Sequence, residues 1–180
     1  MPESLTADHA KFLLNEIFFP LLEREQPRTR QVIEAIPTSG GDYRPDKVSK
    51  TSLELAWHIV SAEKRFLEAV LNGQFNFDPI TRPENVRSGA DIARWHGDMT
   101  STVLPRLRQM TPAQLAKSVD FRGMFQLPAV SFLQLSQNHS IHHRGQLSTY
   151  LRPMGGKVPS IYGESYDAAQ ARAAREGKAS

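Results

Sequence analysis

Clustered histidines are the feature of this sequence with the most evident chemistry. Three of the six histidines lie between Asn138 and Gln146. Positions four apart on an α-helix differ by about 40° around the axis, so His139 and His143 project together. His142 lies about 60° from the first of these and about 100° from the second, so it points elsewhere. Neutral imidazoles at the spacing of His139 and His143 suit a divalent transition metal, with ring nitrogens at about 2.0–2.1 Å from the ion.

A third ligand is expected from a second helix, and His58 is the best candidate. It lies in line with apolar residues of a predicted helix, namely Leu55, Ala62 and Ala69. A buried imidazole needs a hydrogen bond or a metal to offset its desolvation. We therefore predict that His58, His139 and His143 bind one metal ion. Three protein ligands leave coordination positions open for water or substrate, as in catalytic sites.

Other interpretations of the histidines stay open. His139 and His143 could instead bond solvent or neighbouring carbonyl groups. His96, on the apolar face of another predicted helix, could be a third or fourth ligand, although a hydrogen-bonded core histidine is more common at such a position. A fourth protein ligand would favour a structural metal. A pocket between that helix and residues 154–162 would favour catalysis.

Three further residues are candidates for the surroundings of the site. Gln146 lies one turn beyond His143, so it could bond a metal-bound water or a facing helix. Glu63 is about 140° around the helix from His58, so it is expected in a salt bridge or behind a ligand and not as a co-ligand. Arg65 could receive an anionic substrate or extend along the end of the helices.

Composition narrows the classes of protein that fit. The 180 residues, with 39% hydrophobic and 23% charged side chains, are typical of one soluble globular domain. The absence of cysteine excludes disulfides, cysteine-ligated metal centres and a cysteine nucleophile. The net charge is +3 with a pI of about 9.3, but the basic residues are scattered, so we expect no nucleic-acid partner. Because no apolar run approaches roughly 18 residues and no secretion signal is visible, we expect a cytoplasmic protein without a membrane partner.

Helical periodicity dominates the chain and predicts an all-α four-helix bundle. Residues 1–165 are expected to form the bundle, and residues 166–180 a polar C-terminal tail. Thr51 and Glu54 form a capping box at the start of the second helix, and residues 119–127 are predicted to make a short extended excursion. The tail from Tyr162 onward is expected to fray. The four helices are joined by long loops and cover about residues 4–36, 51–72, 88–107 and 128–152.

Beyond these patterns, the sequence resembles the DinB family (DinB/YfiT-like metalloenzymes). The residues that carry the resemblance are Leu55–Glu63 around His58, the element His139-x-x-x-His143-Arg144-Gly145-Gln146-Leu147, and the segment Leu151–Pro159. The resemblance covers roughly residues 5–165. It implies an up-down-down-up bundle that is often dimeric. It also implies a divalent metal, nickel or zinc, held by three histidines that correspond to His58, His139 and His143.

The resemblance also suggests an activity. The best-understood relatives are thiol-dependent enzymes such as mycothiol-dependent maleylpyruvate isomerase and bacillithiol S-transferases. It therefore implies a metal-dependent thiol S-transferase that acts on a small-molecule substrate. The sulfur would come from an exogenous low-molecular-weight thiol, since the chain has no cysteine. The alternatives are a metal-dependent hydrolase and a non-catalytic metal-binding or stress-related protein.

The helical phase of the histidines is testable by substitution. We expect His139→Ala to abolish stoichiometric metal, because it removes one of the predicted ligands, and His142→Ala to leave the metal content nearly unchanged. Elemental analysis of protein purified without added metal or an affinity tag measures both. Equal loss in the two variants would show that the predicted phase is wrong.

Overall fold

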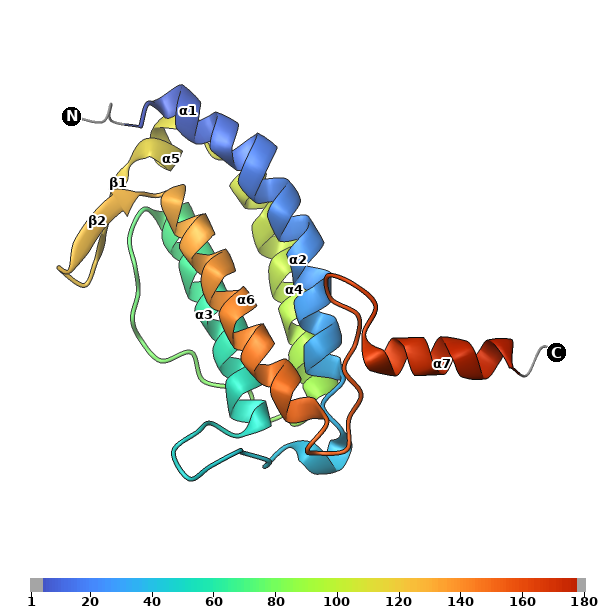
Figure 1. The fold of residues 1–180 in the computed structure, drawn as a ribbon. Coiled ribbons are helices and arrows are strands. Elements are labelled where there is room, and N and C mark those ends of the chain that lie inside the picture. The colour runs from blue at the N-terminus through green and yellow to red at the C-terminus, as the bar shows by residue number, and fades with distance from the viewer. Residues whose placement is uncertain (1–4, 178–180) are drawn as a thin grey trace.

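The computed structural model describes residues 5–177 and confirms the all-α bundle (Figure 1). α3 packs against α4 and α6, and α2 packs against the same two helices. None of the helices within residues 5–177 combines the length and apolar character needed to cross a bilayer. The four long helices are α2 (Phe19–Glu34), α3 (Ser52–Asn72), α4 (Gly89–Arg108) and α6 (Ser131–Leu151).

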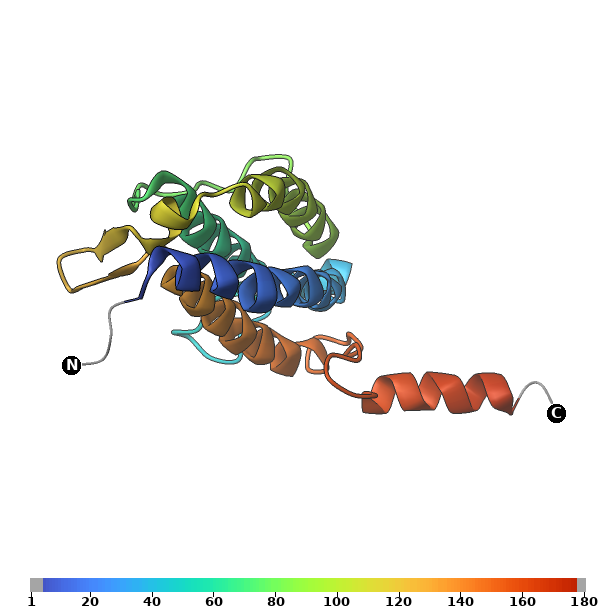
Figure 2. The same cartoon turned by 90° about the horizontal axis from the view of Figure 1, so that it is seen from above.

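Shorter elements extend the bundle at both ends of the chain. α1 and the π-helical segment η1 precede α2, and a β-hairpin lies between α5 and α6. α7 extends away from the bundle in both views (Figures 1 and 2). The bounds are α1 (Ala7–Phe12), η1 (Leu13–Phe18), the 3₁₀ turn η2 (Thr38–Gly40), α5 (Pro112–Ala116), β1 (Ser118–Phe121), β2 (Phe125–Pro128) and α7 (Tyr166–Glu176).

Local sequence signals fix where several helices begin and end. Thr51, Ser88 and Thr111 each accept a hydrogen bond from a backbone amide in the first turn of α3, α4 and α5, and each belongs to a complete capping box. The C-cap of α3 is Gly73, whose φ of 66° is left-handed and suits glycine. The capping box predicted at Thr51 is thus confirmed.

The first helical segment is one continuous helical run with an irregular middle. A proline inside a helix lacks the N–H donor and crowds the preceding turn. Pro20 lies two residues after the end of the π-helical η1, whose wider turn is a common way for a helix to absorb such an irregularity. Pro27 lies within α2 without ending it. The prolines therefore modify this helix without dividing it into two.

Two close backbone contacts show how the long helices are directed. A Cβ on Gly89, at the start of α4, would lie 2.3 Å from the carbonyl oxygen of Ile33 near the end of α2. Gly156, just beyond α6, lies similarly close to the carbonyl of Ala35. The starts of α3 and α4 therefore lie at the end of the bundle where α2 and α6 finish (Figure 1). This arrangement is consistent with the up-down-down-up order.

The structure confirms one further expectation and differs from two. The extended excursion predicted at residues 119–127 is a two-stranded antiparallel hairpin, with Val119 opposite Leu127. α6 begins at Ser131 and not at Pro128, because Pro128 is still paired with Ser118 in that hairpin. The tail that was expected to fray contains α7, a helix without a buried residue, capped at its start by the Ser165 hydroxyl.

A layer of polar side chains divides the core into two apolar clusters. On each of the four long helices, at least one buried polar residue lies between members of one cluster and members of the other. At the centre of this layer is the carboxylate of Glu63 on α3, whose side chain is 3% exposed. It accepts hydrogen bonds from Gln26 Nε2 on α2 at 2.9 Å and from Ser140 Oγ on α6 at 3.4 Å. His96 Nε2 on α4 lies 3.0 Å from Glu63 Oε2, the same oxygen that accepts from Ser140. Glu63 thus joins all four long helices.

The pairing of Glu63 decides its ionisation. Burial alone would raise the pKa of its carboxyl group. The charge of His96, together with the hydrogen bonds from His96, Gln26 and Ser140, instead holds the pKa of Glu63 below its ordinary value. The carboxylate is therefore charged at neutral pH, and removing its charge weakens its contacts with three buried polar partners at once.

We expect Glu63→Gln to lower the free energy of unfolding by about 3 kcal/mol, because it breaks a buried charged pair. Glu68→Gln is the matched control on the same helix. Its carboxylate contacts only the partly exposed Lys64, so the cost should stay below about 1 kcal/mol. Urea denaturation of both variants measures the difference. Equal costs would contradict the central role of Glu63.

Candidate metal site

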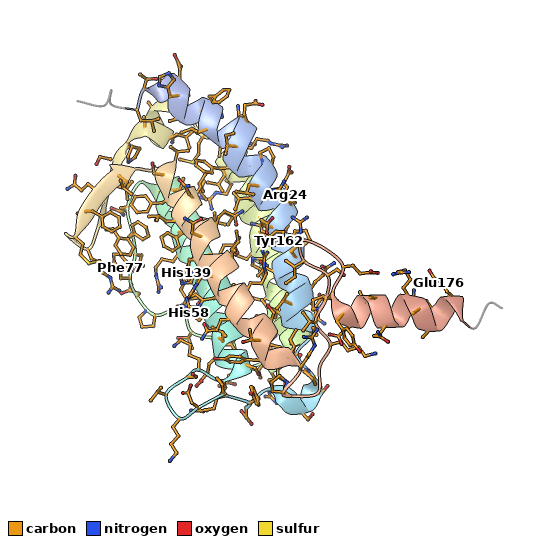
Figure 3. All side chains as sticks on the ribbon, in the orientation of Figure 1. Arg24, His58, Phe77, His139, Tyr162 and Glu176 are labelled. Atoms are coloured by element: carbon orange, nitrogen blue, oxygen red, sulfur yellow. The ribbon has the colours of Figure 1, made fainter. Side chains whose placement is uncertain are left out.

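Three histidines from two helices meet at the side of the bundle. His58 on α3 and His139 and His143 on α6 each offer one ring nitrogen, and these atoms all lie within 4.8 Å of one another. Their ring centroids are 4.5–4.8 Å apart. Figure 3 shows His58 and His139 close together between the two helices. All three side chains are half-buried, so the group is held by the bundle yet open to solvent on one side.

The polar layer fixes the register that brings these rings together. His58 lies on the helix that carries Glu63, and His139 directly precedes Ser140, which donates to Glu63. A shift of α6 along α3 would break this hydrogen bond and separate the rings. The same buried interaction that ties the helices therefore also aligns the histidines.

Hydrogen bonds define which nitrogens are available. His143 Nδ1 lies 3.0 Å from Gln146 Oε1, which can only accept, so Nδ1 carries the proton and Nε2 keeps its lone pair. Gln146 in turn donates from Nε2 to the Tyr150 hydroxyl at 3.3 Å. His139 Nε2 and His58 Nε2 are 3.1 Å apart. Gln146 thus orients one histidine ring and is not bonded to a facing helix.

The ionisation of two of these rings favours ligation. Burial lowers the pKa of His58 to about 4, aided by the charges of His143, Lys50 and Arg65. Burial and the neighbouring histidines also lower the pKa of His139 to about 4. Both rings are therefore neutral at pH 7. Neutral imidazole is the form that binds a metal.

The structure places the remaining candidates outside this group. His96 is a core histidine paired with Glu63, so within residues 5–177 it does not close a fourth coordination position. Glu63 is paired with His96 in the core and does not join the metal group. Arg65 donates to the backbone carbonyls of the loop after α3, at 3.1 and 2.9 Å, so its guanidinium anchors that loop. His142 is exposed and does not join the metal group.

A second buried ionic cluster was not predicted from the sequence. Arg144, between two predicted site residues, is 2% exposed and pairs with Glu25 of α2 at 2.8 Å. Its guanidinium also bonds Thr29 and the Tyr162 hydroxyl. The available signal in the sequence was the position of Arg144 on the face of the helix away from His139 and His143. Arginine is seldom buried without a partner, so a buried arginine there would have indicated an ion pair. The cluster fixes α6 to α2 and holds the segment after α6 against the bundle.

An aromatic wall adjoins the histidines on the side of the hairpin. Phe66 of α3 lies 6.1 Å from the His139 ring, and it contacts Phe75 and Phe121 at centroid distances of 5.7 and 6.3 Å. Arg122 of the hairpin lies over the Phe77 ring at 4.2 Å. Apart from Phe66, these aromatic residues come from the loop after α3 and from the hairpin, so helical periodicity did not reveal them. They shield one side of the histidine group with apolar surface.

A cavity of about 570 Å³ opens on the other side, and His58 lines it. The rest of its lining comes from the loop before α3, from Glu54 and Trp57 of α3, and from Arg82. The alternative that favoured catalysis placed a pocket between α4 and residues 154–162. Neither of these segments lines the cavity at His58. The pocket beside the ligands is thus present, but it is built by different loops, whose positions periodicity cannot predict.

Fold and site together define a helical bundle with a three-histidine group between two of its helices. The DinB family model matches residues 8–177, and the chain belongs to the DinB family. It is 28% identical over 129 residues to the uncharacterized protein YjoA of Bacillus subtilis, covering 71% of this chain and 82% of that protein. It is 26% identical over 147 residues to the uncharacterized protein YrdA of the same organism, covering 81% and 86%.

Solved structures show the same fold. A DinB-like protein from Bacillus cereus superposes with a TM-score of 0.69 at 26% identity, covering 82% of this chain and 97% of that one. The DinB-like protein YjoA from Bacillus subtilis gives a TM-score of 0.68 at 24% identity, with 82% and 99% covered. These structures support the bundle as a whole.

The depressed histidine pKa values predict how the metal-free protein responds to acid. The unfolded chain takes up protons on these residues near pH 6.5, whereas folded His58 and His139 do so only near pH 4. Between these values the unfolded state binds more protons, so stability falls as the pH is lowered through this window. We expect the double variant His58→Gln/His139→Gln to lose less stability over it than the wild type.

Urea denaturation in the presence of a chelator, at several pH values from 7 to 4, measures this difference. His142→Gln is the control, because its ring is exposed and lies outside the group. A double variant with the same pH dependence as wild type would contradict the neutral state of the two buried rings.

Proposed function

We propose that this protein is a metal-dependent enzyme of the thiol S-transferase type, which binds nickel or zinc and uses an exogenous low-molecular-weight thiol. The observation that carries the proposal is the meeting of three imidazoles, each with a ring nitrogen within 4.8 Å of the others, at the edge of a cavity. We further propose a small-molecule substrate, a homodimer and a cytoplasmic location.

The residues present fit a divalent ion. Two ligands at about 2.0–2.1 Å from a tetrahedral ion lie about 3.3 Å from each other. The 3.1 Å between His58 Nε2 and His139 Nε2 is close to that spacing. Within residues 5–177, the buried Nδ1 of His139 has no hydrogen-bond partner, so the ring's only such contact there is with His58. When bound, the metal supplies a positive charge that keeps the sulfur of a thiol deprotonated at neutral pH.

The chain's own residues supply binding and orientation. Gln146 holds the His143 ring through Nδ1, and the polar layer holds α6 in register with α3. The cavity at His58 gives a small molecule access from one side, and the aromatic wall excludes water from the other. These features position two small molecules next to each other, which is a large part of what a transfer reaction needs.

The transfer itself requires nothing further from the chain. The sulfur of the thiol forms a bond to an electrophilic carbon of the second substrate. The leaving group departs with its electron pair, and the thiol proton passes to solvent. The chain has no cysteine, so the sulfur comes from outside.

A hydrolase is less well supported by the carboxylates. Activation of water needs a general base within hydrogen-bond reach of it. Glu63 is buried and occupied by three partners. Glu54, the carboxylate that lines the cavity, accepts the amide proton of Thr51 at 2.7 Å as part of the capping box. Both groups are thus committed to the fold.

The proposal is tested with protein purified without a histidine tag, loaded with nickel or zinc, and incubated with a panel of low-molecular-weight thiols and an electrophile such as 1-chloro-2,4-dinitrobenzene. We expect His58→Ala to lose bound metal and to reduce turnover at least about a hundredfold, since even groups behind the ligands are worth 10–100-fold. His142→Ala is the matched control and should retain both.

The outcomes separate the two parts of the proposal. If the protein binds stoichiometric metal but shows no turnover with any thiol and electrophile, the transferase activity is contradicted and a metal-binding protein remains. If both variants keep their metal, the proposed metal site is contradicted.

A further inference from the structure

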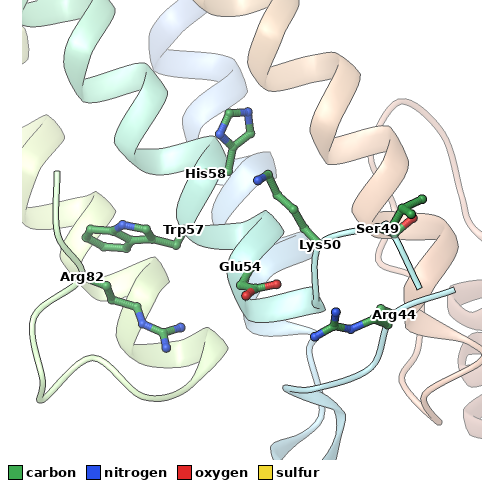
Figure 4. A pocket seen from close by; sticks show the side chains of 8 residues that line it. Arg44, Ser49, Lys50, Glu54, Trp57, His58 and Arg82 are labelled. Atoms are coloured by element: carbon green, nitrogen blue, oxygen red, sulfur yellow. The ribbon is translucent and has the colours of Figure 1, made fainter. Parts of the chain in front are cut away.

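The cavity beside the histidines is lined by an unusual number of positive charges. Arg44 and Lys50 from the loop before α3 and Arg82 from the loop after it lie around the mouth (Figure 4). Figure 4 shows the Lys50 ammonium group directed toward His58. Against these three cations stands one carboxylate, that of Glu54. The wall next to the candidate ligands therefore carries a net positive charge.

These cations have no partners among the described residues. Within residues 5–177, Arg44, Lys50 and Arg82 form no hydrogen bond or ion pair through their side chains. Other basic residues near the site are occupied: Arg65 bonds two carbonyl groups, and Arg144 pairs with Glu25. Three like charges around one cavity repel each other, and the single carboxylate of Glu54 offsets only part of that repulsion.

The loops that carry the cations are well anchored. In the loop before α3, the Asp46 carboxylate accepts hydrogen bonds from the backbone amides of Val48 and Ser49 at 2.9 and 2.8 Å. The loop after α3 is held by Trp57, whose indole N–H donates to the Ile80 carbonyl at 3.0 Å. The side chains are thus presented by ordered backbone, so a ligand need not order the loops to bind.

We propose that Arg44, Lys50 and Arg82 form an anion-binding subsite that holds the carboxylate or phosphate group of a small-molecule substrate, with the rest of that molecule directed toward His58. This inference rests on the proposed function, which it deepens by naming a substrate class. The cavity of about 570 Å³ is within the range of small-molecule sites. Guanidinium and ammonium groups are the usual partners of carboxylates and phosphates.

The positive charge of this cavity extends to the neighbouring histidine group. Lys50 and Arg65 place positive charge close to His58, and a positive field of this kind attracts an anion. A cationic cleft raises the local concentration of anionic molecules and their association rate. The subsite and the histidines are therefore compatible neighbours, even though both are electropositive.

The test is isothermal titration calorimetry on the full-length, metal-free protein at low ionic strength. Inorganic phosphate and succinate are the two probes, which distinguish a phosphate from a carboxylate. The double variant Arg44→Gln/Lys50→Gln should weaken binding of the preferred probe by roughly tenfold or more, because charge-assisted hydrogen bonds are lost. Lys47→Gln/Arg106→Gln removes the same charge outside the cavity and should change the affinity less than about twofold.

Each outcome decides the inference. Selective weakening in the cavity variant supports the subsite, and the tighter probe assigns the anion. Equal affinities in the two double variants, or no wild-type binding of either probe up to about 10 mM, would overturn it. Metal content is measured separately for the same proteins. Failure of the histidines to bind metal counts against the proposed function, while the metal-free titration still decides the subsite.

Discussion

One buried carboxylate determines how the four long helices fit together. Glu63 is charged in the interior, and such a charge is tolerated only when its partners are in place. Those partners come from α2, α4 and α6, so their hydrogen bonds specify the rotation and height of every long helix relative to α3. The apolar clusters above and below supply most of the stabilisation, but apolar contacts are not directional. The polar layer is what makes one register better than its neighbours, and the second ionic cluster, around Arg144, reinforces it from the other face of α6.

The positions of the three histidine rings depend on this fixed arrangement of the helices. Three half-buried imidazoles without an ion between them gain little from each other, and two of them have given up their charge because of their surroundings. Their position is therefore a consequence of the scaffold and not a source of its stability. Placed between an aromatic wall and a cationic cavity, the group faces two different chemical environments within a short distance. A molecule with an apolar part and an anionic part would match both sides at once.

Much of this could be predicted from the sequence where the signals are local. Helical periodicity, the capping box at Thr51 and the four-residue spacing of His139 and His143 each depend on nearby residues, and all were correct in the structure. The prediction that α6 begins at Pro128 was wrong, because strand pairing across the hairpin overrides the preference of proline for a helix start. The burial of Arg144 and the cations of the cavity were not visible for a related reason. Both depend on contacts between distant segments, and loops such as the one carrying Arg44 have no periodicity that would place them.

The separation of the ligands along the chain has a kinetic meaning. His58 and His139 are 81 positions apart, so a large loop must close before the two rings can meet, and such closure comes late compared with the formation of individual helices. Capped helices can form early from their own sequence, whereas the paired rings exist only once the tertiary structure is nearly complete. An ion bound by both helices would thus bind only the native state. It would slow unfolding far more than it would accelerate folding.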